Sequence, residues 1–259
     1  MSRVSELSEL EPPADRPRLS VVVPAYGEGR RIAGTVASLR ETLGVDTEIV
    51  VVDDGSRDDT ASAAEAAKAD LVIRIPDNRG KGAAVRAGML AAHGDVIVFT
   101  DADLSYPPTQ IEVLRAELER GTDVVVGSRR HIGTRTLVRA GRIRELSGRV
   151  FNVFTRLVLQ RKFGDTQCGL KGFRRDAARL IFSESRIDRF AFDVEILWLA
   201  GHNGLSIAEV PVELDSATGS TVSLATDALR MLRDLIRIRR WSAGGAYGPG
   251  ADGDGSGAD

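Results

Sequence analysis

Two aspartates separated by one residue follow the most apolar strand-like stretch of the chain. Residues 96–99 read VIVF, and Asp101 and Asp103 come shortly after them. Because alternate side chains of an extended backbone point to the same side, both carboxylates can face one ligand. Burying unpaired charge is costly, so we expect a partner there, and a divalent cation that also binds a diphosphate is a suitable one. For an isolated pair, the competing interpretation is an aspartate that caps a turn at a strand end.

The elements that must position these acids alternate along the first half of the chain. Expected strands cover residues 19–24, 48–53, 71–75, 95–101 and 123–128, and expected helices cover 30–43, 60–69, 81–93 and 107–120. Apolar strands without period-two alternation, separated by helices, predict a parallel sheet that is covered on both faces. Ligands of such sheets bind outside the carboxyl ends of the strands.

The carboxyl ends of these expected strands are rich in acids and glycines. Four of them read PAYGEG, DDGS, DAD and GSRR, and the loop after the remaining strand reads NRGKGAA. Neither the G-x-G-x-x-G fingerprint nor a P-loop occurs in them, so the charge of a diphosphate must be met in another way. Acids, glycines and a lysine converge on one crevice, which favours the metal interpretation of Asp101 and Asp103 over the turn cap.

Charge is balanced over the whole chain but not along it. The formal net charge of −2 argues against a general nucleic-acid-binding protein. Residues 129–162 nevertheless contain ten lysines or arginines and a single acid, Glu145. A block of like charge without balancing acids is expected to face an anionic partner.

Cysteine content and hydropathy limit the cellular setting. Cys168 is the only cysteine, so no intrachain disulfide can form; we interpret it as a small buried residue and expect a reducing compartment. The N-terminal residues lack the apolar core of a secretory signal, and no apolar run approaches the ~18 residues of a membrane-spanning helix.

The chain is expected to consist of four parts. These are a flexible arm (1–17), an α/β domain (18–215), an amphipathic segment (216–241) and a disordered Gly-rich tail (242–259). Later elements are expected as a basic helix at 142–159, helices at 176–183 and 192–201, a strand at 205–214 and a helix at 224–240. The last helix places Arg230, Arg233, Arg237 and Arg240 opposite its apolar face, and Trp241 at its end is a candidate interfacial anchor.

Eight motifs in a fixed order resemble a known enzyme family. They are SVVVPAYGEG, EIVVVDDGSRDDT, NRGKGAAVRAGM, DVIVFTDADLSYPP, DVVVGSRR, DTQCGLKGFRRDAA, FAFDVEILWLA and IAEVPVEL, and they span about residues 19–240. The chain resembles the inverting family-2 glycosyltransferases with a GT-A fold, in particular the polyprenyl (dolichyl) phosphate glucosyl- and mannosyltransferases. The resemblance implies a GT-A nucleotide-sugar-binding fold, with a mostly parallel sheet, helices on both faces and a C-terminal amphipathic helix.

The resemblance also implies roles for individual residues. The nucleotide sugar would contact Pro24, Tyr26, Glu28, Asp53 or Asp54, Arg79, Lys81, Gly82 and Ala102. Mg²⁺ or Mn²⁺ would be held by Asp101 and Asp103. The acceptor phosphate would meet Arg129, Arg144 and Ser147, and Asp165 would act beside the reacting sugar.

The implied reaction is metal-dependent, inverting transfer of a hexose from a nucleoside-diphosphate sugar to a polyprenyl phosphate. It would take place at the membrane surface, with the protein peripherally bound to the cytoplasmic face. The family's usual asparagine is replaced by Gly27, its GSK by residues 219–221 (GST), and Ser105 stands where mannosyl enzymes often carry glutamine. Glucose from UDP-glucose and mannose from GDP-mannose therefore both stay open.

Three other functions are considered. A transferase acting on a glycan hydroxyl would keep the donor half of the site but would not need the basic block. A sugar-nucleotide pyrophosphorylase would carry a Gly-rich activating loop where this chain has PAYGEG. A non-catalytic binding module would be expected to lose Asp101 and Asp103, and the chain keeps both.

Overall fold

A computed structural model of the protein describes residues 17–131, 134–136, 164–214, 224–245 and 247. The first half contains β1 (Leu19–Ala25), α1 (Ile32–Leu43), β2 (Glu48–Asp54), α2 (Thr60–Ala66), β3 (Leu71–Ile75), α3 (Lys81–Ala91), β4 (Val96–Phe99), α4 (Thr109–Glu119) and β5 (Val124–Ser128). The second half contains β6 (Arg135–Thr136), β7 (Lys171–Arg174), α6 (Arg175–Glu184), α7 (Phe192–His202), β8 (Ile207–Pro211), β9 (Glu213–Leu214) and α8 (Leu224–Ala243).

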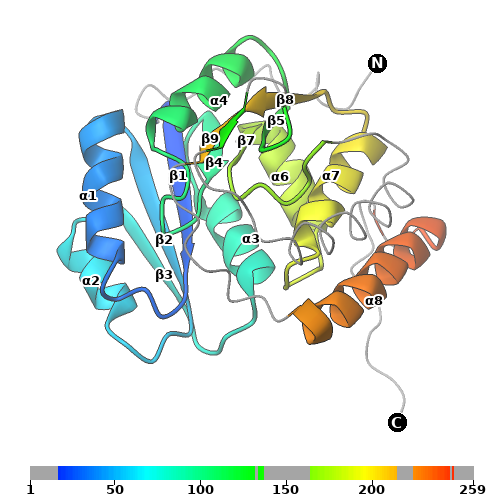
Figure 1. Ribbon diagram of the computed structural model, residues 1–259, viewed down its shortest axis with the longest axis horizontal. Coiled ribbons are helices and arrows are strands. Elements are labelled where there is room, and N and C mark those ends of the chain that lie inside the picture. Colours follow the sequence, from blue (N-terminus) through cyan, green and yellow to red (C-terminus); the bar gives the residue numbers. More distant parts are fainter. Residues whose placement is uncertain (1–16, 132–133, 137–163, 215–223, 246, 248–259) are drawn as a thin grey trace.

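One seven-stranded sheet, in the order β3-β2-β1-β4-β7-β5-β8, organises the molecule (Figure 1). Helices α1, α2 and α4 cover one face, and α3, α6 and α7 cover the other. Strand β1 shows why its sequence is continuously apolar: Val22 packs into the core beside α3, whereas Val21 and Val23 pack into the core beside α1 and α4. The α/β class, the two covered faces and the five predicted strands of the first half are confirmed.

The sheet is mixed and mostly parallel, as the family resemblance implies, and its antiparallel pairs all involve one strand. Strand β7 was not predicted, and it lies antiparallel between β4 and β5. It fits there because a Cβ at Gly172 would come within 2.8 Å of Leu118, and because the ring of Phe173 stacks on Phe99 at 6.2 Å. Such a short strand, with lysine at its start, has no apolar pattern that would identify it.

The C-terminal region differs from the expectation in one respect. Helix α8 is confirmed and extends to Ala243. The tail was expected to be disordered from residue 242, but the side chain of Tyr247 is buried and its hydroxyl lies 2.8 Å from Oε1 of Glu195. The predicted basic helix 142–159, Arg144, Ser147 and residues 219–221 lie outside the described residues.

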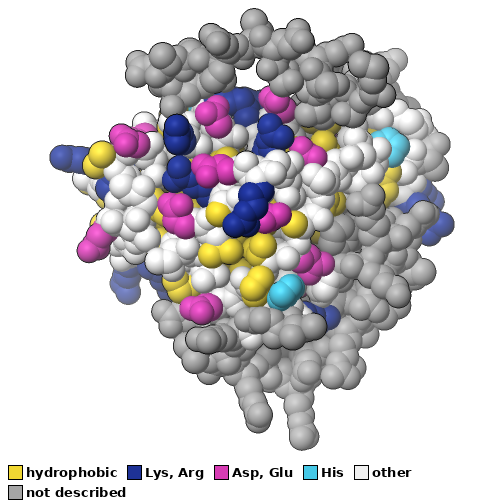
Figure 2. Space-filling model, turned by 90° about the horizontal axis from the view of Figure 1, so that it is seen from above, with side chains coloured by type: hydrophobic (Ala, Val, Ile, Leu, Met, Phe, Trp, Pro, Cys, Tyr) yellow, Lys and Arg dark blue, Asp and Glu magenta, His cyan; other side chains and the backbone are white. Residues whose placement is uncertain are grey.

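The described surface carries mixed charge. On the face seen in Figure 2, Lys and Arg side chains are interspersed with Asp and Glu, and hydrophobic side chains lie between them. Within the part of the chain that the structure describes, no helix is both long and apolar enough to cross a membrane. Cys168 is buried and unpaired by any disulfide, as expected for a structural cysteine.

Candidate active site

The two aspartates of the DAD motif lie in a tight turn at the carboxyl end of β4. The N–H of Leu104 donates to the carbonyl of Asp101 at 3.1 Å, and Leu104 adopts the left-handed region with φ of +46°. From α1, the hydroxyl of Thr35 donates to the carbonyl of Ala102 at 2.6 Å. A left-handed conformation costs energy for a residue with a side chain, so the surrounding structure must hold this turn in place.

An ion pair joins the first aspartate to the first residue of α3. Nζ of Lys81 contacts Oδ1 of Asp101, and both side chains are partly exposed. Burial alone would lower the pKa of Lys81, but Asp101, Asp193 and Asp103 together raise it, so the ammonium stays charged. A Cβ at Gly169 would overlap Oδ2 of Asp101, which explains why the DTQCG motif has glycine at its end.

The acidic turn fits a hard divalent cation. Asp101 and Asp103 offer carboxylate oxygens, and one oxygen of Asp103 also accepts the N–H of Ser105 at 3.0 Å. Among the described residues, no group of three or more His, Cys, Asp or Glu side chains could hold a metal. Two carboxylates are the donor set that Mg²⁺ accepts when a diphosphate and water complete its shell.

A second lysine–aspartate pair lies in the interior near the first. Lys171 of β7 is fully buried, and its Nζ lies 2.5 Å from Oδ1 of Asp193 and 2.6 Å from the carbonyl of Cys168. Burial raises the pKa of Asp193, against the lowering influence of Lys171 and Lys81. Sequence reasoning assigned no role to this pair, although a lysine and an aspartate inside apolar segments (LKGF and FAFDVEIL) were the available signal.

Arg129 and Asp165 form one unit at the end of β5. Nε and Nη2 of Arg129 lie 2.5 and 2.8 Å from the two carboxylate oxygens of Asp165, and the backbone N–H of Arg129 donates to the same carboxylate at 3.2 Å. Burial would raise the pKa of Asp165, but the hydrogen bonds and charge of Arg129 bring it below its usual value of 3.8. The arginine side chain is 42% exposed and the aspartate 5%, so the guanidinium can still meet an anion.

On the expected nucleotide side, the two neighbouring acids of DDGS accept hydrogen bonds from backbone N–H groups. Asp54 accepts the N–H groups of Arg79 and Gly80 at 2.9 and 2.7 Å, and Asp53 accepts the N–H of Ser56 at 3.0 Å. Both oxygens of Asp54 therefore fix the NRGKG loop. The first turn of α3, which follows this loop, also packs closely, because a Cβ at Gly82 would overlap the carbonyl of Ile187 and the side chain of Phe192.

The remaining predicted residues at β1 are more open. Pro24 is half-buried, Tyr26 is 53% exposed, and Glu28 pairs with Arg31 at 2.9 Å. Among the described residues, neither Tyr26 nor Glu28 bonds to another predicted site residue. The structure thus brings together Lys81 with Asp101, Arg129 with Asp165, and Asp54 with Arg79, from loops far apart in the sequence.

Comparison with curated proteins gives relatives over most of the chain. The dolichyl-phosphate beta-glucosyltransferase of Drosophila melanogaster is 36% identical over 240 residues, covering 85% of this chain and 74% of the relative. The enzymes of the same name from Saccharomyces cerevisiae and Dictyostelium discoideum are 35% and 33% identical and cover 85% and 90% of this chain, and 74% and 77% of their own length.

Solved structures and family models point the same way. Glucosyl-3-phosphoglycerate synthase from Mycobacterium tuberculosis, in complex with Mn²⁺, UDP and glucosyl-3-phosphoglycerate, superposes with a TM-score of 0.65 at 25% identity, covering 91% of this chain and 82% of that one. Its complex with Mg²⁺ and UDP gives a TM-score of 0.64. Residues 20–182 match the model of glycosyl transferase family 2. The chain therefore belongs to glycosyltransferase family 2 and has the GT-A fold.

Proposed function

We propose that this protein transfers glucose from UDP-glucose to a polyprenyl phosphate such as dolichyl phosphate, with inversion at the anomeric carbon. The observation that carries this proposal is the acidic turn at β4 together with the Arg129–Asp165 pair at β5, in a chain whose relatives are dolichyl-phosphate beta-glucosyltransferases. Those relatives favour glucose over mannose, which the sequence motifs leave open.

In the donor half, the chain supplies two carboxylates and the ammonium group of Lys81. Asp101 and Asp103 would hold Mg²⁺ or Mn²⁺, which when bound would stabilise the departing diphosphate. Lys81 stays protonated and is partly exposed, so its ammonium can exchange Asp101 for a phosphate oxygen. Asp54 fixes the loop that carries Arg79 and leads into α3 at Lys81, and Tyr26 offers an exposed ring at the end of β1.

In the acceptor half, the chain needs to position an anion more than to activate it. A phosphate monoester has a second pKa near 6 and is already a nucleophilic anion at about pH 7. Its oxygen would attack C1 of glucose as the bond from C1 to UDP breaks. Arg129 would orient the phosphate, and Asp165 would hold the guanidinium without taking a proton, because its pKa is below its usual value.

A glycan hydroxyl acceptor is the second candidate, and one contact weighs against it. A hydroxyl needs a positioned base to remove its proton. Asp165 is expected to lie near the reacting sugar, and both of its oxygens accept hydrogen bonds from the Arg129 guanidinium. We further propose that the protein works peripherally at the membrane surface, since the acceptor of the favoured reaction is a lipid.

The test is a transfer assay with radiolabelled UDP-glucose and GDP-mannose. Polyprenyl phosphate should be glucosylated in the presence of Mg²⁺ or Mn²⁺, whereas polyprenol should not be, because it lacks the anion that Arg129 would bind. Arg129→Ala should raise the acceptor KM and lower kcat with little change in donor affinity. Comparable turnover of polyprenol or a free oligosaccharide, or a defect of Arg129→Ala confined to the donor, would contradict the proposal.

A further inference from the structure

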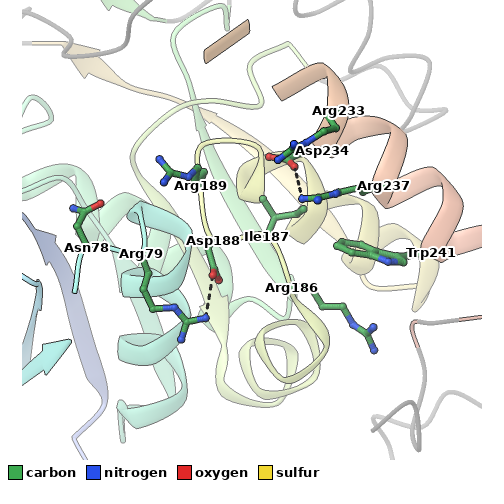
Figure 3. A pocket seen from close by; sticks show the side chains of 10 residues that line it. All are labelled: Asn78, Arg79, Arg186, Ile187, Asp188, Arg189, Arg233, Asp234, Arg237 and Trp241. Carbon is green, nitrogen blue, oxygen red and sulfur yellow. Dashed lines mark hydrogen bonds and ion pairs between the residues drawn. The ribbon is translucent and has the colours of Figure 1, made fainter. Parts of the chain in front are cut away.

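A cavity of about 450 Å³ lies between the loop after β3, the loop from Arg186 to Arg189, and helix α8 (Figure 3). Its walls carry five arginines, namely Arg79, Arg186, Arg189, Arg233 and Arg237. Asp101, Asp103, Arg129 and Asp165 do not line it, and Arg79 is the one residue that it shares with the predicted nucleotide-sugar site. Its volume is in the range of small-ligand sites.

The cavity has more positive charge than its own acids can balance. Asp188 pairs with Arg79 at 3.0 Å and also with Arg86, and Asp234 pairs with Arg237 at 3.3 Å. Arg189 and Arg233 are exposed and make no ion pair within the described ranges. The interspersed charges seen in Figure 2 are therefore replaced here by a local excess of arginine.

The arginine-bearing loop is fixed before any ligand binds. The buried carboxylate of Glu195 accepts the N–H groups of Arg186 and Ile187 at 3.0 and 2.8 Å, and the hydroxyl of Tyr247 at 2.8 Å. The guanidinium of Arg186 lies 6.0 Å from the ring centre of Trp241. These contacts fix the backbone of the loop from which Arg189 extends, and the planar guanidinium of arginine matches the oxygens of a phosphate group.

The surface of α8, which forms one wall of the cavity, indicates that the ligand belongs to a membrane. On α8, Ile236 is 49% exposed and is flanked by Arg233 and Arg237, while Arg239 and Arg240 are exposed nearby. An exposed apolar side chain among arginines on an amphipathic helix is typical of a helix that lies on an anionic bilayer. Trp241, a candidate anchor in the sequence, is half-buried and forms an apolar wall of the cavity.

We propose that this cavity binds the phosphate head group of an anionic membrane lipid, with Arg189 and Arg233 as its principal ligands and Trp241 beside the first apolar atoms of the lipid. A phosphate monoester, with about two negative charges near pH 7, fits the excess of cations better than a diester with one. Because Arg129 would bind the phosphate of the acceptor in the proposed reaction, this is a second lipid-phosphate site, and it does not depend on which sugar the protein transfers.

The test measures binding of the full chain to vesicles of phosphatidylcholine that contain phosphatidic acid, a monoester. Vesicles of the same surface charge made with phosphatidylglycerol, a diester, serve as the comparison. Arg189→Gln combined with Arg233→Gln should weaken binding to the monoester vesicles by about tenfold or more, as expected for the loss of charge-assisted contacts. Arg74→Gln combined with Arg120→Gln removes the same charge from exposed positions outside both the cavity and α8 and should weaken binding by less than about threefold.

Three outcomes would overturn the proposal. Equal losses in the two double variants would assign binding to general surface charge. Equal binding of the wild-type protein to both vesicle types would remove the preference for a monoester. Binding of inorganic phosphate that Arg189→Gln and Arg233→Gln abolish, without any preference for monoester vesicles, would make the cavity a site for a soluble phosphate.

Discussion

Two lysine–aspartate pairs occupy neighbouring regions of the molecule with very different access to water. At the mouth of the candidate site, the side chains of Lys81 and Asp101 are 23% and 33% exposed. In the interior, those of Lys171 and Asp193 are 0% and 8% exposed. The two regions are coupled, because Asp193 contributes to the raised pKa of Lys81.

The difference separates a pair that can exchange partners from one that cannot. Water and incoming ligands can replace either member of the exposed pair, and pairs of that kind contribute only about 0–1 kcal/mol to stability. Removing one member of a buried pair leaves an uncompensated charge and costs about 3–5 kcal/mol. The same two residue types can thus serve ligand binding in one region and the integrity of the sheet in the other.

The largest effect is expected from breaking the interior pair. Lys171→Met should lower the free energy of unfolding by about 3–5 kcal/mol, because Asp193 would keep its burial and lose its cation. Chemical denaturation monitored by circular dichroism measures this. Lys171→Met combined with Asp193→Leu should be more stable than either single variant, and a double variant at least as unstable as the singles would contradict the interpretation.

Breaking the exposed pair of Lys81 and Asp101 should reduce activity strongly and stability only slightly. Asp101→Asn should lower kcat by about 10²–10³, as for loss of a key electrostatic group, while changing the free energy of unfolding by no more than about 1 kcal/mol. Wild-type protein in excess EDTA should lose activity to a similar degree. Full turnover in either condition would exclude a metal held by the acidic turn.

A third ion pair has intermediate exposure and gives a prediction in pH. The pKa of Asp165 in the folded protein lies below its usual 3.8, so its stabilising effect is complete above pH 3.8 and is lost as the pH falls through the lower folded value. Asp165→Asn should therefore reduce stability near pH 7 by about 1–2 kcal/mol and flatten the decline below pH 4. Unfolding curves collected from pH 2 to pH 7 measure both effects. An unchanged acid slope would mean that Arg129 does not hold the carboxylate ionised.

The smallest effect on stability is expected at Glu195. This buried acid accepts hydrogen bonds from neutral donors, whereas the buried Asp193 pairs with a lysine. Tyr247→Phe should reduce the free energy of unfolding by about 0.5–1.5 kcal/mol, because Glu195 would keep two backbone donors and lose one hydroxyl. Tyr26→Phe removes a hydroxyl from an exposed ring and serves as the matched control. Equal stability of Tyr247→Phe and Tyr26→Phe would show that the tail adds nothing to the anchoring of the Arg186–Arg189 loop.

Sequence patterns could identify those parts of the fold and the site that depend on residues close together in the chain. The strands from β1 to β5 are continuous apolar runs, and the acids of DDGS and DAD stand at their ends, so both could be predicted. The pairing of Lys171 with Asp193 could not, because it depends on β7 entering the sheet from a distant part of the chain. Tyr247 was missed for the same reason, since a Gly-rich composition carries no sign of a buried partner.

The place of β7 in the sheet has a consequence for how the chain folds during synthesis. Among the described strands, β5 pairs only with β7 and β8, both of which follow it by more than forty residues. At a translation rate of about 5–20 residues per second, β5 must wait several seconds for a partner, and β4 has one open edge during the same interval. An unpaired strand edge can pair with another chain and so promotes aggregation. Fragments that end before Lys171 should therefore be poorly soluble, and a useful C-terminal boundary for expression lies after Tyr247.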